Sequence, residues 1–120
     1  MAEQSFRVVN LETAIDELQA KLAATGGTHE ALAVSHPGRM TAVLFCFRRG
    51  HVLQDHAAPG PVSIHALRGS LRVRVVEETE TVALAAGSVL LLDPGVHHSV
   101  EAVEDSALLV TIGAAPSGVH

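Results

Sequence analysis

The sequence contains very few aromatic side chains. Its 120 residues include no Trp, no Tyr and only three Phe, although hydrophobic residues make up 48% of the chain. We therefore expect a core filled by Val, Leu, Ile and Ala, without rows of rings on which nucleobases or aromatic ligands could stack. The length is that of one domain, and the apolar content is too high for a disordered chain.

Basic residues and cysteine are also scarce. Eight Lys and Arg stand against thirteen Asp and Glu, so the formal net charge is −5 and nucleic acid is not an expected partner. No apolar run approaches the ~20 residues of a membrane span, and the polar N-terminus has no secretory signal. The single Cys46 cannot form an internal disulfide and is expected to be a buried small hydrophobe. These features predict a cytoplasmic protein with no membrane partner.

Histidine, in contrast, is abundant. The chain has eight His, as many as Lys and Arg together. Imidazole ligates metals and exchanges protons near neutral pH, so the surplus raises the possibility of a metal site or of proton transfer.

Hydrophobic periodicity indicates one helix followed by many strands. Residues 11–24 carry an apolar stripe at helical spacing, which we expect to pack on the body of the domain, a dimer contact being the alternative. Beyond residue 30, short apolar runs alternate with Gly and Pro breaks every 8–12 residues or so, which is typical of an all-β sandwich or small barrel. The runs are 31–34, 40–47, 62–67, 71–76, 81–84, 89–92, 99–102 and 107–112. The arginines of this region, Arg68, Arg72 and Arg74, are expected on a solvated face.

Two separated segments resemble the motifs of the cupin family, specifically small single-domain (RmlC-like) cupins. The family's first motif is G-x5-H-x-H-x3,4-E-x6-G, and its second is G-x5-P-x-G-x2-H-x3-N. The residues that fall at family positions are Gly50, His56 and Gly69 in the first motif, and Gly87, Gly95 and His98 in the second. The resemblance covers roughly residues 40–112.

The resemblance implies a single antiparallel jelly-roll β-barrel preceded by one helix. We divide the one domain into a leading part, 1–38, the barrel, 39–113, and a loose tail, 114–120. The family, together with the need to cover sheet edges, also implies a homodimer. The pocket of such a barrel would bind a small-molecule ligand, here expected to be largely uncharged because the strands carry few charges.

The sequence departs from the family pattern at three motif positions, two of which carry metal ligands in the family. Ala58 stands at the second His, Val62 at the Glu and Ala102 at the Asn, so His56 and His98 are the two family ligands that remain. His65 is the candidate third metal ligand. Strict strand alternation directs it away from the face of Val62, whereas a β-bulge would bring it inward, and the sequence leaves both open.

The other histidines are expected to be peripheral. His97 should lie at the rim because its neighbour His98 points inward, His51 should be exposed, and His29 and His36 should be surface residues in loops. The terminal His120 is uninformative.

Two classes of function remain open. In the first, His56 and His98, with His65 if it points inward, weakly hold one divalent metal (Fe, Mn, Zn or Ni), and no organic cofactor is used. Oxygenase-like or isomerase-like chemistry, as in other cupins, would then be available, with catalytic residues unknown. In the second, the chain is a non-catalytic ligand-sensing or structural cupin that has lost its metal site. Fold alone does not decide between an enzyme and a binding module.

Overall fold

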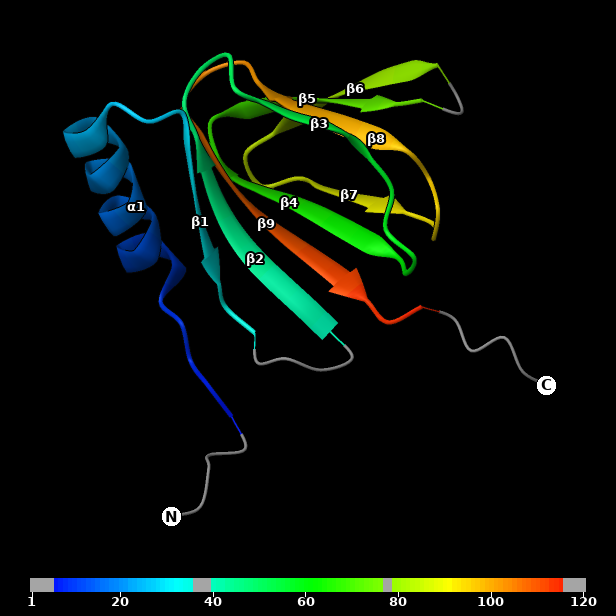
Figure 1. Cartoon of the computed structure of the whole chain (residues 1–120), viewed down its shortest axis with the longest axis horizontal. Helices are drawn as coiled ribbons and strands as arrows, with labels where there is room; N and C mark the ends of the chain where they lie inside the picture. Colours follow the sequence, from blue (N-terminus) through cyan, green and yellow to red (C-terminus); the bar gives the residue numbers. More distant parts are fainter. Residues whose placement is uncertain (1–5, 36–39, 77–78, 116–120) are drawn as a thin grey trace.

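The computed structural model describes residues 6–35, 40–76 and 79–115, and every structural statement below concerns those residues. One helix precedes nine strands (Figure 1). The helix is α1 (Leu11–Thr25). The strands are β1 (His29–Ala33), β2 (Met40–Phe47), β3 (Val52–His56), β4 (Val62–Arg68), β5 (Ser70–Val75), β6 (Glu80–Ala85), β7 (Val89–Leu92), β8 (His98–Ala102) and β9 (Ser106–Gly113).

The strands form two antiparallel sheets that face each other. The larger sheet has the order β1-β2-β9-β4-β7, and the smaller has the order β3-β8-β5-β6. Figure 1 shows the smaller sheet above the larger one, with α1 outside the pair. The predicted all-β class with one leading helix is therefore confirmed, although the two sheets stay separate rather than closing into a continuous barrel.

Side-chain alternation gives the five-stranded sheet two buried faces. Between the sheets lies the main core, which includes Phe47, Ile64 and Leu108 from the large sheet and Val73 and Val100 from the small one. The opposite, outer face forms a second core under α1. Its buried members are Ala14, Ile15, Leu22, Leu44, Cys46 and Ala107.

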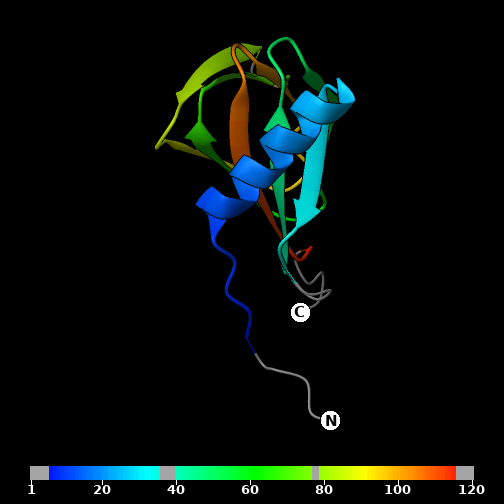
Figure 2. The same cartoon turned by 90° about the vertical axis from the view of Figure 1, so that its left-hand side faces the viewer.

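Helix α1 has a well-defined beginning and end. The Asn10 side chain caps it by accepting a hydrogen bond from the Thr13 amide at 3.0 Å, and Gly26 ends it in the left-handed conformation. Figure 2 shows the helix lying obliquely across the outer face of the large sheet, where it contacts β1 and β2. The stripe thus packs on its own domain, as expected.

Arg68, at the end of β4, forms ion pairs that link the sheet to helix α1. Its guanidinium pairs with Glu12 and, at 3.0 Å, with Asp16, both on α1. Arg68 stays partly exposed, but the bulge at the end of β4 turns its side chain toward the helix, so it does not share the solvated face predicted for it with Arg72 and Arg74. Arg72 and Arg74 are exposed as expected, and Arg72 pairs with Glu101 at 3.1 Å.

Cys46 lies fully buried under the helix. Burial raises the pKa of its thiol to about 11, an effect only partly opposed by the positive charge of Arg68. The thiolate is therefore negligible near neutral pH, and Cys46 acts as a packing residue, as the sequence predicted.

Most of the strands were predicted nearly to the residue, and two local differences matter. The run Val52–His56 is a strand that the apolar pattern did not show, because its polar residues outnumber its apolar ones. His29, expected in a loop, begins β1, although its exposure was correctly expected. His36 and His120 lie outside the described residues.

The helix contacts β1 and β2, and the opposite edge of the large sheet, strand β7, has exposed apolar side chains. On the edge strand β7, Val89 is 52% exposed and Leu91 is 73% exposed. The homodimer predicted from the family and from the sheet edges stays a prediction. In the described part of the chain, no helix has the length and apolar character needed to cross a membrane.

Gly69 joins β4 to β5 in a conformation that a side chain would disrupt. It has a φ of +75°, and a Cβ there would collide with the Asp105 carbonyl oxygen and with Oγ of Ser106. We predict that Gly69→Ala lowers the free energy of unfolding by about 3 kcal/mol or more, as measured by urea denaturation. The matched control is Gly87→Ala, since Gly87 has a φ of +94° with open space around it and should lose only ~1 kcal/mol. Equal losses would show that the collision plays no part.

Candidate functional site

Two of the three predicted metal-site histidines meet in space. His56 ends β3, His98 begins β8, and the two residues are directly opposite in the strand register. Their ring centroids are 4.3 Å apart with the planes inclined by 52°. His98 is buried, with 2% of its surface exposed, whereas His56 remains accessible. The pair therefore joins a buried ring to one that solvent can reach.

A β-bulge in β3 creates this pairing. Leu53 faces Val100 and His56 faces His98, so β3 spans three residues where β8 spans two. Strict alternation from the inward-pointing Leu53 would have brought Asp55 opposite His98 instead. The extra residue reverses the phase of the strand and brings the exposed His56 beside His98.

Backbone carbonyls fix the hydrogen positions on both rings. Nδ1 of His56 lies 2.8 Å from the Gln54 carbonyl oxygen, and Nδ1 of His98 lies 3.1 Å from that of Val96. Because a carbonyl oxygen only accepts, each Nδ1 must carry the hydrogen. In the neutral rings the lone pair is then on Nε2, which is the form in which imidazole binds a metal.

The structure does not bring His65 to this pair. Val62, Ile64 and Ala66 face the core between the sheets, so alternation turns His65 to the outer face. There it lies opposite Leu109, which packs with the helix. The bulge in β4 comes only after Ala66 and leaves the phase of His65 unchanged.

The three substituted family positions are packed with apolar side chains. Ala58, Val62 and Ala102 are all buried in the core between the sheets. Within residues 6–35, 40–76 and 79–115, no group of three or more His, Cys, Asp or Glu is arranged to hold a metal ion. The His56–His98 pair supplies two imidazoles at this site, which would leave most of a metal's coordination positions to water or ligand.

A pocket of about 550 Å³ opens beside His56. Its walls come from β1, β2 and β3, so it lies between the β1 edge of one sheet and the β3 edge of the other. The lining residues are His29, Ala31, Phe45, Phe47, His51, Val52, Leu53, Gln54, Asp55 and His56. Neither Lys nor Arg is among them, and Asp55 is the one carboxylate.

Rings follow one another along this pocket. His29 stacks on His51 with centroids 4.5 Å apart, His51 lies 4.6 Å from Phe47, and Phe47 lies 5.5 Å from Phe45. The expectation that stacking surfaces are missing was therefore wrong: two of the three Phe line this pocket. Their spacing on either side of Cys46 was the available signal, since it puts both on one face of a strand.

His51 is half-buried, not exposed as the sequence suggested. Burial lowers the pKa of its imidazole below the ordinary value of 6.5, and the neighbouring His29 lowers it further. His97, in contrast, lies at the rim as expected, 3.6 Å from the Asp55 carboxylate, while its neighbour His98 points inward.

Comparison with solved structures identifies the fold. An RmlC-like cupin from Desulfovibrio desulfuricans matches with a TM-score of 0.65 and 22% identity, over 94% of this chain and 96% of that one. A cupin superfamily protein from Desulfitobacterium hafniense matches with a TM-score of 0.70 and 16% identity, over 73% and 79%. Salicylate 1,2-dioxygenase from Pseudoaminobacter salicylatoxidans matches with a TM-score of 0.70 and 18% identity, over 86% of this chain and 32% of the enzyme.

These likenesses show that the chain has the RmlC-like cupin fold, and the predicted resemblance is confirmed at that level. No protein-family model and no curated protein matches the sequence. The fold is shared by enzymes and by proteins described only by their fold, so the function must be argued from the site.

The stacked pair His29–His51 makes a testable prediction about pH. Because the pKa of His51 is lowered in the folded state, the unfolded chain binds more protons, and this residue favours unfolding as the pH falls below about 6.5. We predict an NMR titration midpoint for the His51 ring below 6.5, moving upward in His29→Phe, which keeps a ring but removes the charge. An ordinary midpoint in the unaltered protein would contradict this account.

Proposed function

We propose that this chain is a small-molecule-binding cupin-fold protein in which His56 and His98 hold a labile divalent metal at the wall of the pocket. One observation carries the proposal: each ring donates from Nδ1 to a backbone carbonyl, so the neutral form of each ring has its lone pair on Nε2. The ring centroids lie 4.3 Å apart, so both rings belong to one site.

The chemistry of this donor pair sets the strength of binding. Imidazole nitrogen suits Zn, Fe, Ni and other borderline divalent metals. Two protein ligands alone would hold such an ion weakly, so we expect a metal that exchanges readily. When bound, it would supply Lewis acidity next to the pocket. The chain's own part is to orient the two rings through the Gln54 and Val96 carbonyls.

The pocket walls indicate what kind of molecule it would take. Phe45, Phe47 and Leu53 give an apolar surface, while the polar groups are mainly imidazoles. A volume of about 550 Å³ is within the usual range for small ligands. We therefore infer a small, mostly apolar ligand with a polar group directed at His56.

A second candidate is a non-catalytic ligand-binding cupin that uses no metal. The buried Ala58, Val62 and Ala102 favour it, because they fill with apolar atoms the positions at which the resembled motifs carry polar residues. In that case His56 would contact the ligand directly. The two candidates share the pocket and differ in whether metal binds to the histidine pair.

Metal titration separates the two candidates. If the proposal is right, Co²⁺ or Zn²⁺ binds at about one equivalent, and His56→Ala weakens binding by ~10-fold or more because it removes one of two protein ligands. Isothermal titration calorimetry on untagged protein measures both effects. The matched control is His65→Ala, which removes a histidine from the outer face and should leave binding unchanged.

Two results would contradict the metal proposal. One is the absence of metal binding in the unaltered protein, which would favour the non-catalytic candidate. The other is an equal loss in His65→Ala and His56→Ala, which would show adventitious binding by scattered histidines. Circular dichroism spectra of both variants check that the fold is retained.

The pocket itself can be tested by filling it. Ala31 lies on the exposed edge strand β1 and lines the pocket, so Ala31→Trp should place an indole in the cavity with little effect on stability. We predict that small apolar fragments shift the NMR signals of Phe45 and Leu53 in the unaltered protein, and that Ala31→Trp abolishes those shifts. Fragments that shift these signals equally in both proteins would place binding elsewhere.

A further inference from the structure

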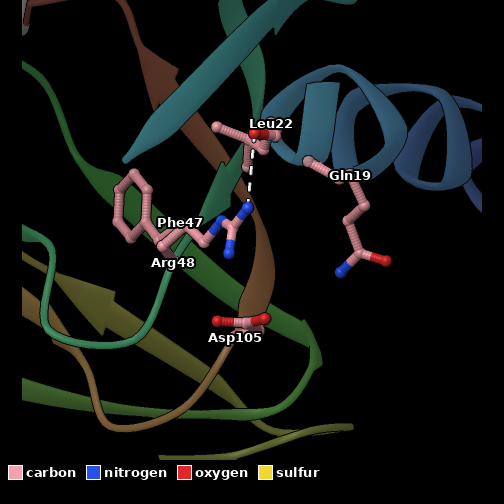
Figure 3. Close-up of a pocket in the computed structure, with 6 residues that line it drawn as sticks. Gln19, Leu22, Phe47, Arg48 and Asp105 are labelled. Atoms are coloured by element: carbon pink, nitrogen blue, oxygen red, sulfur yellow. Dashed lines mark hydrogen bonds between the residues drawn. The ribbon is translucent and has the colours of Figure 1, made fainter. Parts of the chain in front are cut away.

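A second cavity, which Phe47 also lines, lies between the C-terminal half of α1 and the end of β2. Its volume is about 300 Å³, and its lining residues are Gln19, Leu22, Ala23, Phe47, Arg48 and Asp105. Figure 3 shows side chains from three separate parts of the chain around it: α1, the end of β2 and the β8–β9 connection. Neither of the two cupin-like motifs includes these residues.

Arg48 and Asp105 are each held in place by a backbone group. Nη2 of Arg48 donates to the Leu22 carbonyl at 3.3 Å, in the last turn of α1. Oδ1 of Asp105 accepts a hydrogen bond from the Arg49 amide at 2.9 Å. Both side chains keep further hydrogen-bonding capacity, since a guanidinium has five N–H donors and a carboxylate has several acceptor positions.

The side-chain amide of Gln19 is oriented by a hydrogen bond from Arg68. Its Oε1 accepts from Arg68 Nη1 at 3.1 Å, and Arg68 is in turn held by Glu12 and Asp16. This bond assigns the oxygen end of the amide, so the NH2 group is the end left over as a donor. No hydrogen bond to that NH2 group is present in the described part of the chain.

The charges around the cavity are separated rather than paired. In Figure 3 the Arg48 guanidinium and the Asp105 carboxylate lie on two sides of the opening, and these two side chains form no ion pair. Leu22 and Phe47 provide apolar surface between them. Three preoriented polar groups around an apolar wall favour ligand binding, because little ordering remains to oppose it.

We propose that this cavity binds a small zwitterion of the α-amino-acid type. The carboxylate of the ligand would accept hydrogen bonds from Arg48 and from the Gln19 NH2 group, and its ammonium group would donate to Asp105. Its side chain would lie against Leu22 and Phe47. A simple anion would leave Asp105 unfavourably close to negative charge, and a simple cation would meet Arg48, so neither matches the site as well.

This site is independent of the metal proposal. It uses none of the histidines, and only Phe47 lines both cavities. The test must therefore locate the ligand as well as detect it. Amide NMR signals of Ala23 and Asp105 report on the cavity beside the helix, whereas signals of His51 and His56 report on the histidine pocket.

The experiment compares L-leucine with its two halves by NMR titration of the full chain. The probes are L-leucine, 4-methylpentanoate, which lacks the ammonium group, and 3-methylbutylamine, which lacks the carboxylate. We expect saturable shifts of the Ala23 and Asp105 amides with L-leucine, and binding at least ~10-fold weaker for each half molecule. No saturable shift with L-leucine, or equal binding of either half, would overturn the proposal.

Two variants test the charged groups separately. Asp105→Asn keeps an oxygen for the Arg49 amide but removes the charge, and Arg48→Met keeps much of the side-chain length but removes the donors. Each should weaken L-leucine binding by ~10-fold or more, while Glu17→Gln, at an exposed position on α1, should not. If Arg48→Met fails to fold, Asp105→Asn decides alone: unchanged affinity in that variant, or shifts confined to His51 and His56, would refute the proposed site.

Discussion

The rest of this structure depends on the alternation of side chains in the five-stranded sheet. One set of residues, among them Ile64 and Leu108, faces the other sheet, and the opposite set, among them Leu44 and Cys46, faces the helix. Because both faces are buried over much of the sheet, a slip of one residue in β2, β4 or β9 would exchange the two sets and expose apolar surface. The register is thus fixed strongly, and with it the place of each histidine on the large sheet.

This constraint explains why the candidate site contains two histidines and not three. His65 belongs to the outer set, and bringing it inward would move its strand neighbours Ile64 and Ala66 out of the core. His56 escapes the same rule because β3 is an edge strand of the smaller sheet and carries a bulge. An irregularity is tolerated at an edge because it disturbs one ladder of hydrogen bonds rather than two.

Sequence reasoning succeeded where the signal was local and periodic. The limits of α1, β2 and β7 follow from hydrophobic spacing, and the positions of His56 and His98 follow from the spacing of the two motifs. It failed where the answer depended on contacts between distant segments. The stacking of His29 on His51, for example, follows from the pairing of β1 with β2, which no local pattern specifies. Arg68 was misplaced for a similar reason, since its partners lie on the helix, more than fifty residues away.

The central claim is that His56 and His98 together hold a divalent metal, with the hydrogen of each neutral ring on Nδ1. Long-range proton–nitrogen NMR spectra of metal-free protein on the alkaline side of neutrality test this most directly, because they distinguish the two neutral forms of each imidazole. We expect both rings to carry the hydrogen on Nδ1, and added Zn²⁺ to shift the Nε2 resonances of both. Hydrogen on Nε2 in either ring, or a Zn²⁺ effect confined to other histidines, would contradict the account.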